Sequence, residues 1–181
     1  FNDKNSMTAD PTDSMYVYGV WDRLSTPTGY LNNPERTFGL GFKGPALFAR
    51  TTSGGLSWEP VKTIYDPGAN NQTIGNQIVV GKTGRLFDFF DEILNFRTAN
   101  GGTRSLYNLA YVYSDDKGAT WKPKGQSRRI QTMQTVGVVL PTSGQPNDVR
   151  TGDIIPDVAV DRANGNLYAV WQDSRFRNGR I

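Results

Sequence analysis

The feature that most constrains the fold of this chain is an internal repeat. The segment TTSGGLSW at residues 51–58 and the segment SDDKGATW at residues 114–121 share a hydroxyl, a polar third residue, Gly, a second hydroxyl and Trp. A second set of segments occurs three times, as YVYGVWDR (16–23), RLFDFFDE (85–92) and NLYAVWQD (166–173). Such repetition indicates one structural unit used several times, in which each unit buries its hydrophobic face against the next.

Each unit reads as antiparallel β-structure. Short runs of aromatic and β-branched residues are interrupted by Gly, Asn, Asp and Pro, which is typical of strands joined by turns. The Asn-Gly pairs at 164–165 and 178–179 carry the two-residue hairpin signal, and GKTG at 81–84 predicts a further turn. The segment FFDEILNF (89–96) has a helix-like spacing, but it aligns with a strand that we expect to end at Asp91 before a loop.

The chemistry of SDDKGATW favours a rigid turn. Asp116 is placed to accept backbone N–H groups, Gly118 supplies a positive φ, and Thr120 closes the turn with its hydroxyl. We expect Trp121 to enter the following strand and bury its indole against the neighbouring sheet. A calcium loop is the rival interpretation because Asp115 adjoins Asp116, but the twelve-residue pattern of oxygen ligands ending in Glu is missing.

The motif Ser-x-Asp-x-Gly-x-Thr-Trp resembles the Asp box, or bacterial neuraminidase repeat, of sialidases and related β-propellers. The complete copy consists of Ser114, Asp116, Gly118, Thr120 and Trp121, and the first copy of Thr51, Ser53, Gly55, Ser57 and Trp58. Ser53 stands where the family has Asp, so we expect its hydrogen bonds to be weaker or differently made. Trp58 and Trp121 are expected to be equivalent anchors in successive sheets.

The resemblance implies an all-β fold, a β-propeller of the sialidase-like type. Residues 1–181 would form a single partial propeller domain with about three four-stranded antiparallel blades. The repeat units are expected at about 1–60, 61–125 and 126–181, the last of them incomplete. Propellers close with four to eight blades, so we expect either further sequence in a longer chain or self-association to complete the ring.

In this family the box has a structural role on the face opposite the substrate. The resemblance therefore implies a ligand at the other end, where second strands end and first strands begin. The charged residues expected there are Asp3, Lys4, Asp22, Arg23, Asp91, Glu92, Arg150, Asp153, Asp173 and Arg175. Arginine grips a carboxylate through paired hydrogen bonds and carboxyl groups act as acid or base, which suits a sugar acid. The alternative is that most of these charges cap loops or bridge neighbouring blades.

The sequence departs from the sialidase pattern where catalysis is concerned. Sialidases carry their first arginine in an Arg-Ile-Pro motif, whereas Ile154 stands here before Ile155 and Pro156. No Tyr and Glu nucleophile pair is evident, so no catalytic residue is assigned. The chain has no Cys and no His, which excludes disulfides, thiolate sites and histidine catalysis. We expect no metal and no cofactor.

Composition limits the partners. The net charge of +3 is scattered, which argues against nucleic acid because phosphate binding needs a clustered basic face. The locally basic stretch KPKGQSRR (122–129) is interpreted as a solvated loop. No apolar run is long enough to span a membrane, and the first residues lack the features of a signal peptide. The resemblance implies a secreted or cell-surface protein whose export signal is not in this chain.

Three functions follow from these observations. The first is glycan recognition or glycoside hydrolysis of an exo-sialidase-like kind outside the cell. The second is a non-catalytic propeller that acts as an adhesion or protein-binding scaffold, which the missing arginine favours. The third is a metal-stabilised secreted scaffold.

Overall fold

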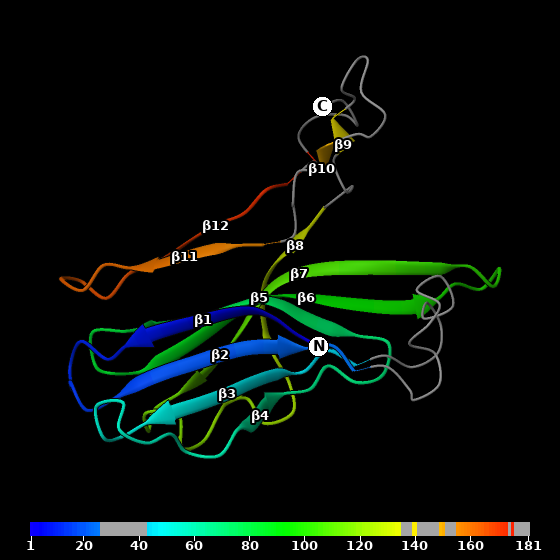
Figure 1. The fold of residues 1–181 in the computed structure, drawn as a ribbon. Coiled ribbons are helices and arrows are strands. Elements are labelled where there is room, and N and C mark those ends of the chain that lie inside the picture. Colours follow the sequence, from blue (N-terminus) through cyan, green and yellow to red (C-terminus); the bar gives the residue numbers. More distant parts are fainter. Residues whose placement is uncertain (26–42, 135–138, 141–148, 151–154, 174, 176–181) are drawn as a thin grey trace.

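The computed structural model describes residues 1–25, 43–134, 139–140, 149–150, 155–173 and 175. Within these ranges the chain is all-β and contains no α-helix. The strands are β1 (Asn2–Ala9), β2 (Val17–Arg23), β3 (Ala46–Thr51), β4 (Lys62–Tyr65), β5 (Gln72–Val80), β6 (Leu86–Arg97), β7 (Thr103–Ser114), β8 (Arg128–Met133), β9 (Val139–Leu140), β10 (Val149–Arg150), β11 (Asp157–Val160) and β12 (Leu167–Val170). The expectation of an antiparallel all-β chain is confirmed (Figure 1).

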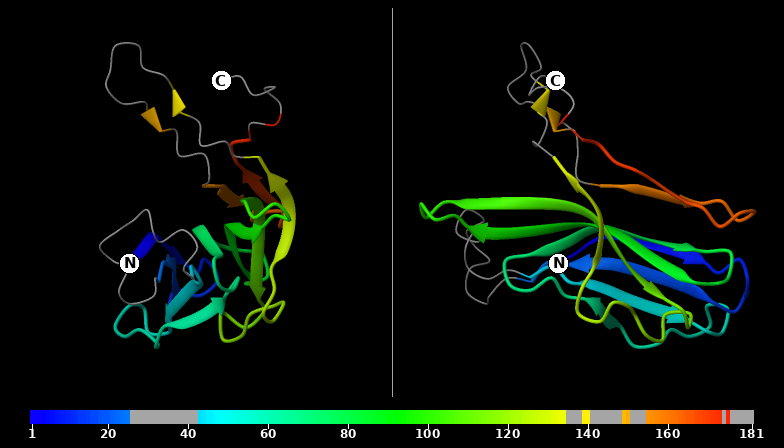
Figure 2. Two further views of the ribbon diagram at one scale, coloured as in Figure 1. Left: turned by 90° about the vertical axis from the view of Figure 1, so that its right-hand side faces the viewer. Right: turned by 180° about the vertical axis from the view of Figure 1, so that it is seen from behind.

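Two four-stranded meanders form the body of the molecule. The first sheet has the order β1-β2-β3-β4 and the second has the order β5-β6-β7-β8. The hairpin β11-β12, called the third pair below, is stacked beyond the second sheet, and β9-β10 form a separate short pair (Figures 1 and 2). In both meanders neighbouring strands in the sequence are neighbours in the sheet, as short connections favour.

The sheets meet through their first strands. β5 contacts β1 and β2 of the first sheet and also β11 of the third pair. The fourth strands, β4 and β8, lie at the far edges of their sheets. The three successive units therefore stack face to face, with their first strands closest together (Figure 2).

The core fills the spaces between these units. Alternate residues of each strand point to opposite faces, so each sheet can bury one set of side chains on either side. Between the first and second sheets the buried set is Tyr18, Val20, Ala46, Phe48, Tyr65, Ile78, Val80, Leu86, Phe90, Ala110 and Val112. Beyond the second sheet, Val79, Phe89, Leu109 and Met133 pack against Val158, Val160, Leu167, Ala169 and Trp171.

Strand β6 is longer than the sequence suggested. The expected end at Asp91 is wrong, because β6 continues to Arg97 and pairs with β7 residue by residue as far as Thr103. Within this extension, the side-chain amide nitrogen of Asn95 donates to the backbone carbonyl of Asn70, before β5, at 2.6 Å. Pairing with β7 satisfies the backbone hydrogen bonds of this segment. The segment is therefore a strand, although its apolar residues have a helix-like spacing.

The turns are partly as expected. The 81–84 turn is present, with the Gly84 N–H donating to the Gly81 carbonyl at 2.9 Å. A hairpin also occurs at 164–165, but its turn is longer than two residues and closes between Asp161 and Asn166. The 178–179 pair lies outside the described residues. The fourth strands β4 and β8 begin after the expected unit ends at 60 and 125 and belong to the preceding units.

Candidate functional site

The turn at residues 114–121 is closed by a network around Asp116. Its carboxylate accepts the Thr120 N–H at 2.8 Å, the Thr120 hydroxyl at 2.6 Å and the Ser114 hydroxyl at 2.7 Å. Gly118 has a φ of +85° and donates its N–H to Ser114 Oγ at 2.8 Å. Desolvation acts to raise the pKa of Asp116, but the hydrogen bonds from Thr120 and Ser114 outweigh it and hold the pKa at about 2. The carboxylate is engaged as a structural acceptor.

The turn at residues 51–58 makes the same connections with hydroxyls alone. Ser53 Oγ accepts the Ser57 N–H at 3.0 Å and lies 3.0 Å from the Ser57 hydroxyl. Thr51 Oγ1 accepts the Gly55 N–H at 3.0 Å, and Gly55 has a φ of +97°. The two turns therefore share one backbone shape, although only the second contains a carboxylate.

The tryptophans that end the two turns lie in different environments. Trp121 packs edge to face on Phe48 of β3, with ring centroids 5.1 Å apart, and joins the core between the sheets. Trp58 lies on the outer face of the first sheet and is 45% exposed. The expectation that Trp121 enters the following strand is wrong, because β8 begins only at Arg128. The expected burial holds for Trp121 alone, since no described sheet precedes the first one.

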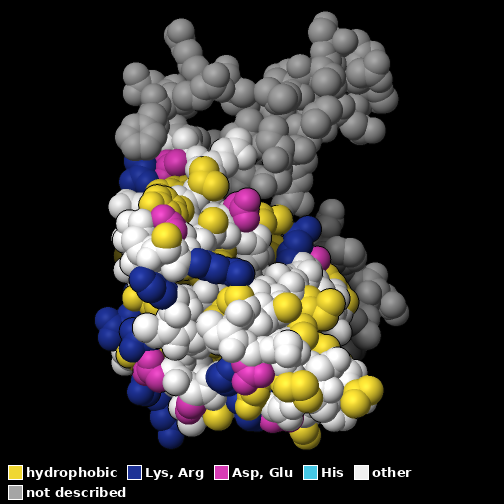
Figure 3. Space-filling model, turned by 90° about the vertical axis from the view of Figure 1, so that its left-hand side faces the viewer, with side chains coloured by type: hydrophobic (Ala, Val, Ile, Leu, Met, Phe, Trp, Pro, Cys, Tyr) yellow, Lys and Arg dark blue, Asp and Glu magenta, His cyan; other side chains and the backbone are white. Residues whose placement is uncertain are grey.

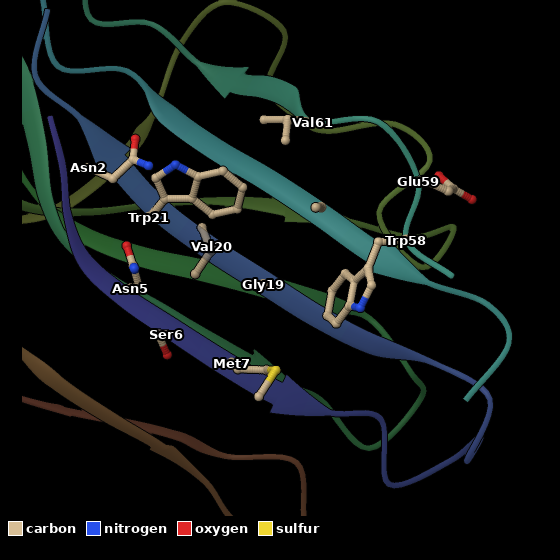
Figure 4. Close-up of a pocket in the computed structure, with 11 residues that line it drawn as sticks. Asn2, Asn5, Ser6, Met7, Gly19, Val20, Trp21, Trp58, Glu59 and Val61 are labelled. Carbon is tan, nitrogen blue, oxygen red and sulfur yellow. The ribbon is translucent and has the colours of Figure 1, made fainter. Parts of the chain in front are cut away.

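The outer face of the first sheet forms a pocket of about 520 Å³. Figure 4 shows the indoles of Trp21 and Trp58 on the same side of the sheet, with Gly19 of β2 between them. A Cβ atom at Gly19 would lie 3.7 Å from the Trp58 ring, so the indole rests on the backbone of β2. We call the apolar lining the outer tryptophan face; it consists of Met7, Gly19, Trp21, Ala49, Trp58 and Val61.

Asp22 and Arg23, expected at the ligand end, have separate roles. Asp22 is buried in register with Asp3 of β1, and neither of its carboxylate oxygens has a hydrogen-bond partner among the described residues. Burial raises the pKa of Asp22 to about 7, and the Asp3 carboxylate adds to this rise. Arg23 donates from Nε to the Asn2 side chain at 2.8 Å. The two side chains do not form a joint binding site.

Asp91 and Glu92 are also buried in the stack. Asp91 accepts the backbone N–H of Asn108 at 3.1 Å. Glu92 accepts the Tyr65 hydroxyl at 2.5 Å, and it also accepts the Ser127 hydroxyl at 2.7 Å and Arg129 Nε at 2.5 Å. The first of these contacts joins β4 of the first sheet to β6 of the second sheet. The network therefore connects two units, and its members Tyr65, Ser127 and Arg129 also line a pocket of about 400 Å³.

In the contact between Tyr65 and Glu92, the Tyr65 hydroxyl is the donor and the carboxylate is the acceptor. Burial and the hydrogen bond to Glu92 raise the pKa of Tyr65 above its ordinary value, so its hydroxyl remains protonated. No sequence motif marks this pair, because only the stacking of the sheets brings the two residues together. Arg129 was expected in a solvated loop, but it lies in β8 and forms an ion pair with the buried Glu92.

Of the remaining expected ligand residues, Asp173 and Arg175 are paired with each other, and Lys4 donates its backbone N–H to the Asp3 carboxylate at 2.8 Å. The Asp173 carboxylate accepts the Arg175 guanidinium and the Trp171 indole N–H. The hydrogen bond from Arg175 lowers the pKa of Asp173 to about 2. Arg150 is described only as backbone in β10, and Asp153 lies outside the described residues.

A second pocket lies at the end opposite the two turns. Ser114 at the end of β7 begins the second turn, so the start of β7 and the end of β8 lie at the other end of the sheet. The pocket there has a volume of about 420 Å³. It is lined by Arg104, Ser105, Leu106, Tyr107, Thr132, Met133, Gln134 and Arg175. Of these, only Arg175 was a candidate from the sequence, because no motif marks the others.

The end that carries the turns has mixed chemistry. Figure 3 views the molecule from the side on which β1 and β3 end in Figure 1, and Lys and Arg side chains are scattered there among acidic and hydrophobic ones. Several of these cations are paired: Asp115, for example, contacts both Arg85 and Lys122. This face therefore carries no continuous basic surface.

The described part of the chain has neither a membrane-spanning helix nor a cluster of metal ligands. It contains no helix that is long and apolar enough to cross a membrane. The same residues contain no group of three or more His, Cys, Asp or Glu that would hold a metal ion. No family model and no curated protein matches the chain.

Proposed function

We propose that this chain forms part of a sialidase-like Asp-box β-propeller that recognises acidic glycans outside the cell. The propeller is supported by the stack of equivalent four-stranded meanders, which meet through their first strands. The two matching turns between third and fourth strands support the Asp-box assignment. Two complete blades and the start of a third would then be present.

The pocket at the start of β7 carries the proposal of a glycan ligand. Arg104 is exposed there and forms no ion pair with any described residue, and Arg175 lies on the same pocket. Guanidinium groups bind carboxylates through paired hydrogen bonds. Tyr107 offers an aromatic surface, and Thr132 and Gln134 offer polar groups for sugar hydroxyls. This combination suits a monosaccharide that bears a carboxylate.

Recognition is favoured over hydrolysis by the positions of the acidic residues. Asp22, Asp91 and Glu92 are buried within the stack, and Asp173 is engaged by Arg175. Glycosidases need carboxyl groups, or a tyrosine in place of one, at the scissile bond. Within the described ranges the pocket lining contains no acidic residue.

A second candidate is a scaffold that binds protein. The observation that favours it is the exposed outer tryptophan face, since aromatic residues and Met are enriched at protein interfaces.

Calorimetric titration with N-acetylneuraminate and with galactose tests the glycan proposal. We expect the acid to bind and the neutral sugar to bind at least about 10-fold more weakly. Arg104→Ala should weaken binding of the acid by about 10-fold or more, whereas Arg97→Ala, on the same hairpin but outside the pocket, should not. Equal binding of the two sugars, no binding of either, or no effect of Arg104→Ala would contradict the proposal.

A further inference from the structure

The strand registers establish which residues of the two sheets are equivalent. β1 and β5 each have one register irregularity, between Asp3 and Ser6 and between Ile74 and Gln77, and these align the two strands. By the same registers, residues of the outer tryptophan face correspond to residues of the second sheet. The equivalent pairs are Met7 with Ile78, Trp21 with Phe90, Ala49 with Val112 and Trp58 with Trp121.

Every one of these counterparts packs against the preceding sheet. Ile78, Phe90, Val112 and Trp121 all belong to the core between the first and second sheets. In the first sheet the equivalent Met7 is 70% exposed and Trp58 is 45% exposed. In the second sheet, the equivalent surface packs against the preceding sheet. In the first sheet this surface is the outer tryptophan face, and no described sheet covers it.

The third pair repeats the arrangement. Its hairpin register makes Val158 equivalent to Ile78 and Trp171 equivalent to Phe90, and both pack on the second sheet. The stack therefore continues in one direction, with each unit presenting the same positions to the unit before it.

The far side of the third pair is a complementary surface. Tyr168 and Val170 of β12 are 56% and 66% exposed. The registers make them equivalent to Tyr18 and Val20 of β2, which are buried against the second sheet. The first sheet thus exposes the positions that, in the second sheet, pack against a preceding unit. The third pair exposes the positions that, in the first sheet, pack against a following unit.

We propose that the outer tryptophan face is the docking surface for a second copy of this chain, which contributes the Tyr168 and Val170 side of its third pair. The chain itself carries both complementary surfaces, so the contact is head to tail. Such contacts form rings when their rotation closes. The inference rests on the stacked-unit part of the proposed function and not on the glycan pocket. A sugar as the occupant is disfavoured because the apolar positions Met7 and Trp58 correspond to sites of sheet packing.

Sedimentation velocity of the 181-residue chain over a range of concentrations tests the proposal. We expect reversible association that Trp58→Arg weakens by about 10-fold or more, with Met7→Arg acting in the same way. Leu56→Arg is the matched control, because Leu56 lies in the adjacent turn, is 91% exposed and does not line the face. Unchanged unfolding midpoints would establish that the variants are folded.

Mixing variants separates a head-to-tail contact from a symmetric one. Trp58→Arg retains the Tyr168 surface, and Tyr168→Arg retains the outer tryptophan face. Each variant alone should associate about 10-fold or more weakly than the wild type, but an equimolar mixture should form dimers through the one intact interface. A monomeric wild-type chain, association that survives both Trp58→Arg and Met7→Arg, or a mixture that stays monomeric would overturn the proposal. Since Arg104→Ala should leave association unchanged, failure here is distinguishable from failure of glycan binding.

Discussion

Gly118 lies directly against Phe48, although the two residues belong to different sheets. A Cβ atom built on Gly118 would be 2.4 Å from Cζ of the Phe48 ring, and Trp121 contacts the same ring edge to face. The turn that follows β7 is therefore also a packing surface against β3. Its glycine is required both for a positive φ and for close approach.

Gly118→Ala should destabilise the protein more than Gly55→Ala. Both glycines have a positive φ, so both variants should lose about 1 kcal/mol through backbone strain. Only Gly118 also meets a neighbouring ring, because no atom lies within 4 Å of the Cβ position at Gly55. We expect a further loss of about 1 to 3 kcal/mol for Gly118→Ala in urea unfolding. Equal losses for the two variants would contradict close packing of this turn on β3.

Phe48→Ala should lower the free energy of unfolding by about 3 to 5 kcal/mol. Phe48 is buried between the sheets, where it contacts Tyr18 and Trp121. Phe96→Ala is the control, since Phe96 is exposed on the β6–β7 hairpin and its removal should cost less than about 1 kcal/mol. Chemical denaturation measures both, and similar effects would show that the inter-sheet core is not the main source of stability.

Sequence periodicity was sufficient for the strands and for the repeat, because these depend on local patterns. The hydrogen bonds of the second turn were predictable for the same reason, since Asp116 and Thr120 are close in the chain. The length of β6 was not, because its extension depends on pairing with β7 as far as Thr103. Helix-like spacing in 89–96 carries no information about that partner.

Asp116→Ser would give the second turn the residue that the first turn has in Ser53. We expect a loss of about 1 kcal/mol or less at pH 7, because the carboxylate is exposed but accepts three hydrogen bonds. The folded-state pKa of Asp116 is lowered to about 2 from 3.8. Its stabilisation is therefore present above pH 4 and lost as the pH falls through 2. Unfolding at pH 7 and pH 2 should show the difference between wild type and variant shrinking; a constant difference would contradict this role.

Asp22→Asn should stabilise the protein at alkaline pH. The pKa of Asp22 is raised from 3.8 to about 7 in the folded state. Folding therefore becomes less favourable as pH rises from about 4 to 7, because the unfolded chain ionises first. We expect the free energy of unfolding of the variant to exceed that of the wild type by about 1 to 4 kcal/mol at pH 8 and by little at pH 4. Asp157→Asn, at an exposed position of β11, controls for the loss of one charge, and an equal gain there would refute the assignment.

Glu92→Gln should weaken the connection between the first and second sheets. Glu92 is buried and accepts hydrogen bonds from Tyr65, Ser127 and Arg129. Breaking a buried ion pair costs about 3 to 5 kcal/mol, and we expect about 2 to 3 because the Arg129 side chain is 55% exposed. Glu59→Gln, whose pairs with Arg50 and Lys62 lie nearer the surface, should cost about 1 kcal/mol or less. Thermal unfolding of both variants decides between these outcomes.

The candidate site was harder to predict from the sequence than the fold was. Repeat positions placed Asp22 near the end of β2, but Asp91 and Glu92 lie in the middle of β6. The burial of all three could not be predicted, because it depends on how the sheets stack. No sequence motif marks Arg104 or Tyr107. The pocket combines the start of β7 with the end of β8, which are separated in the sequence, so no local pattern predicts it. The exposure of Trp58 could not be inferred either, since it depends on the surface of a neighbouring unit.

Both four-stranded sheets bend at the same places. The irregularities between Asp3 and Ser6 in β1 and between Ile74 and Gln77 in β5 are matched on the third strands by those between Ala46 and Leu47 and between Leu109 and Ala110. The positions of these irregularities are thus a shared property of the two repeats, and a β-bulge bends the strand that carries it. If a gene gained or lost one copy of this repeat unit, each remaining unit would keep the same arrangement on its neighbour. The number of units could therefore change during evolution without changes to the others.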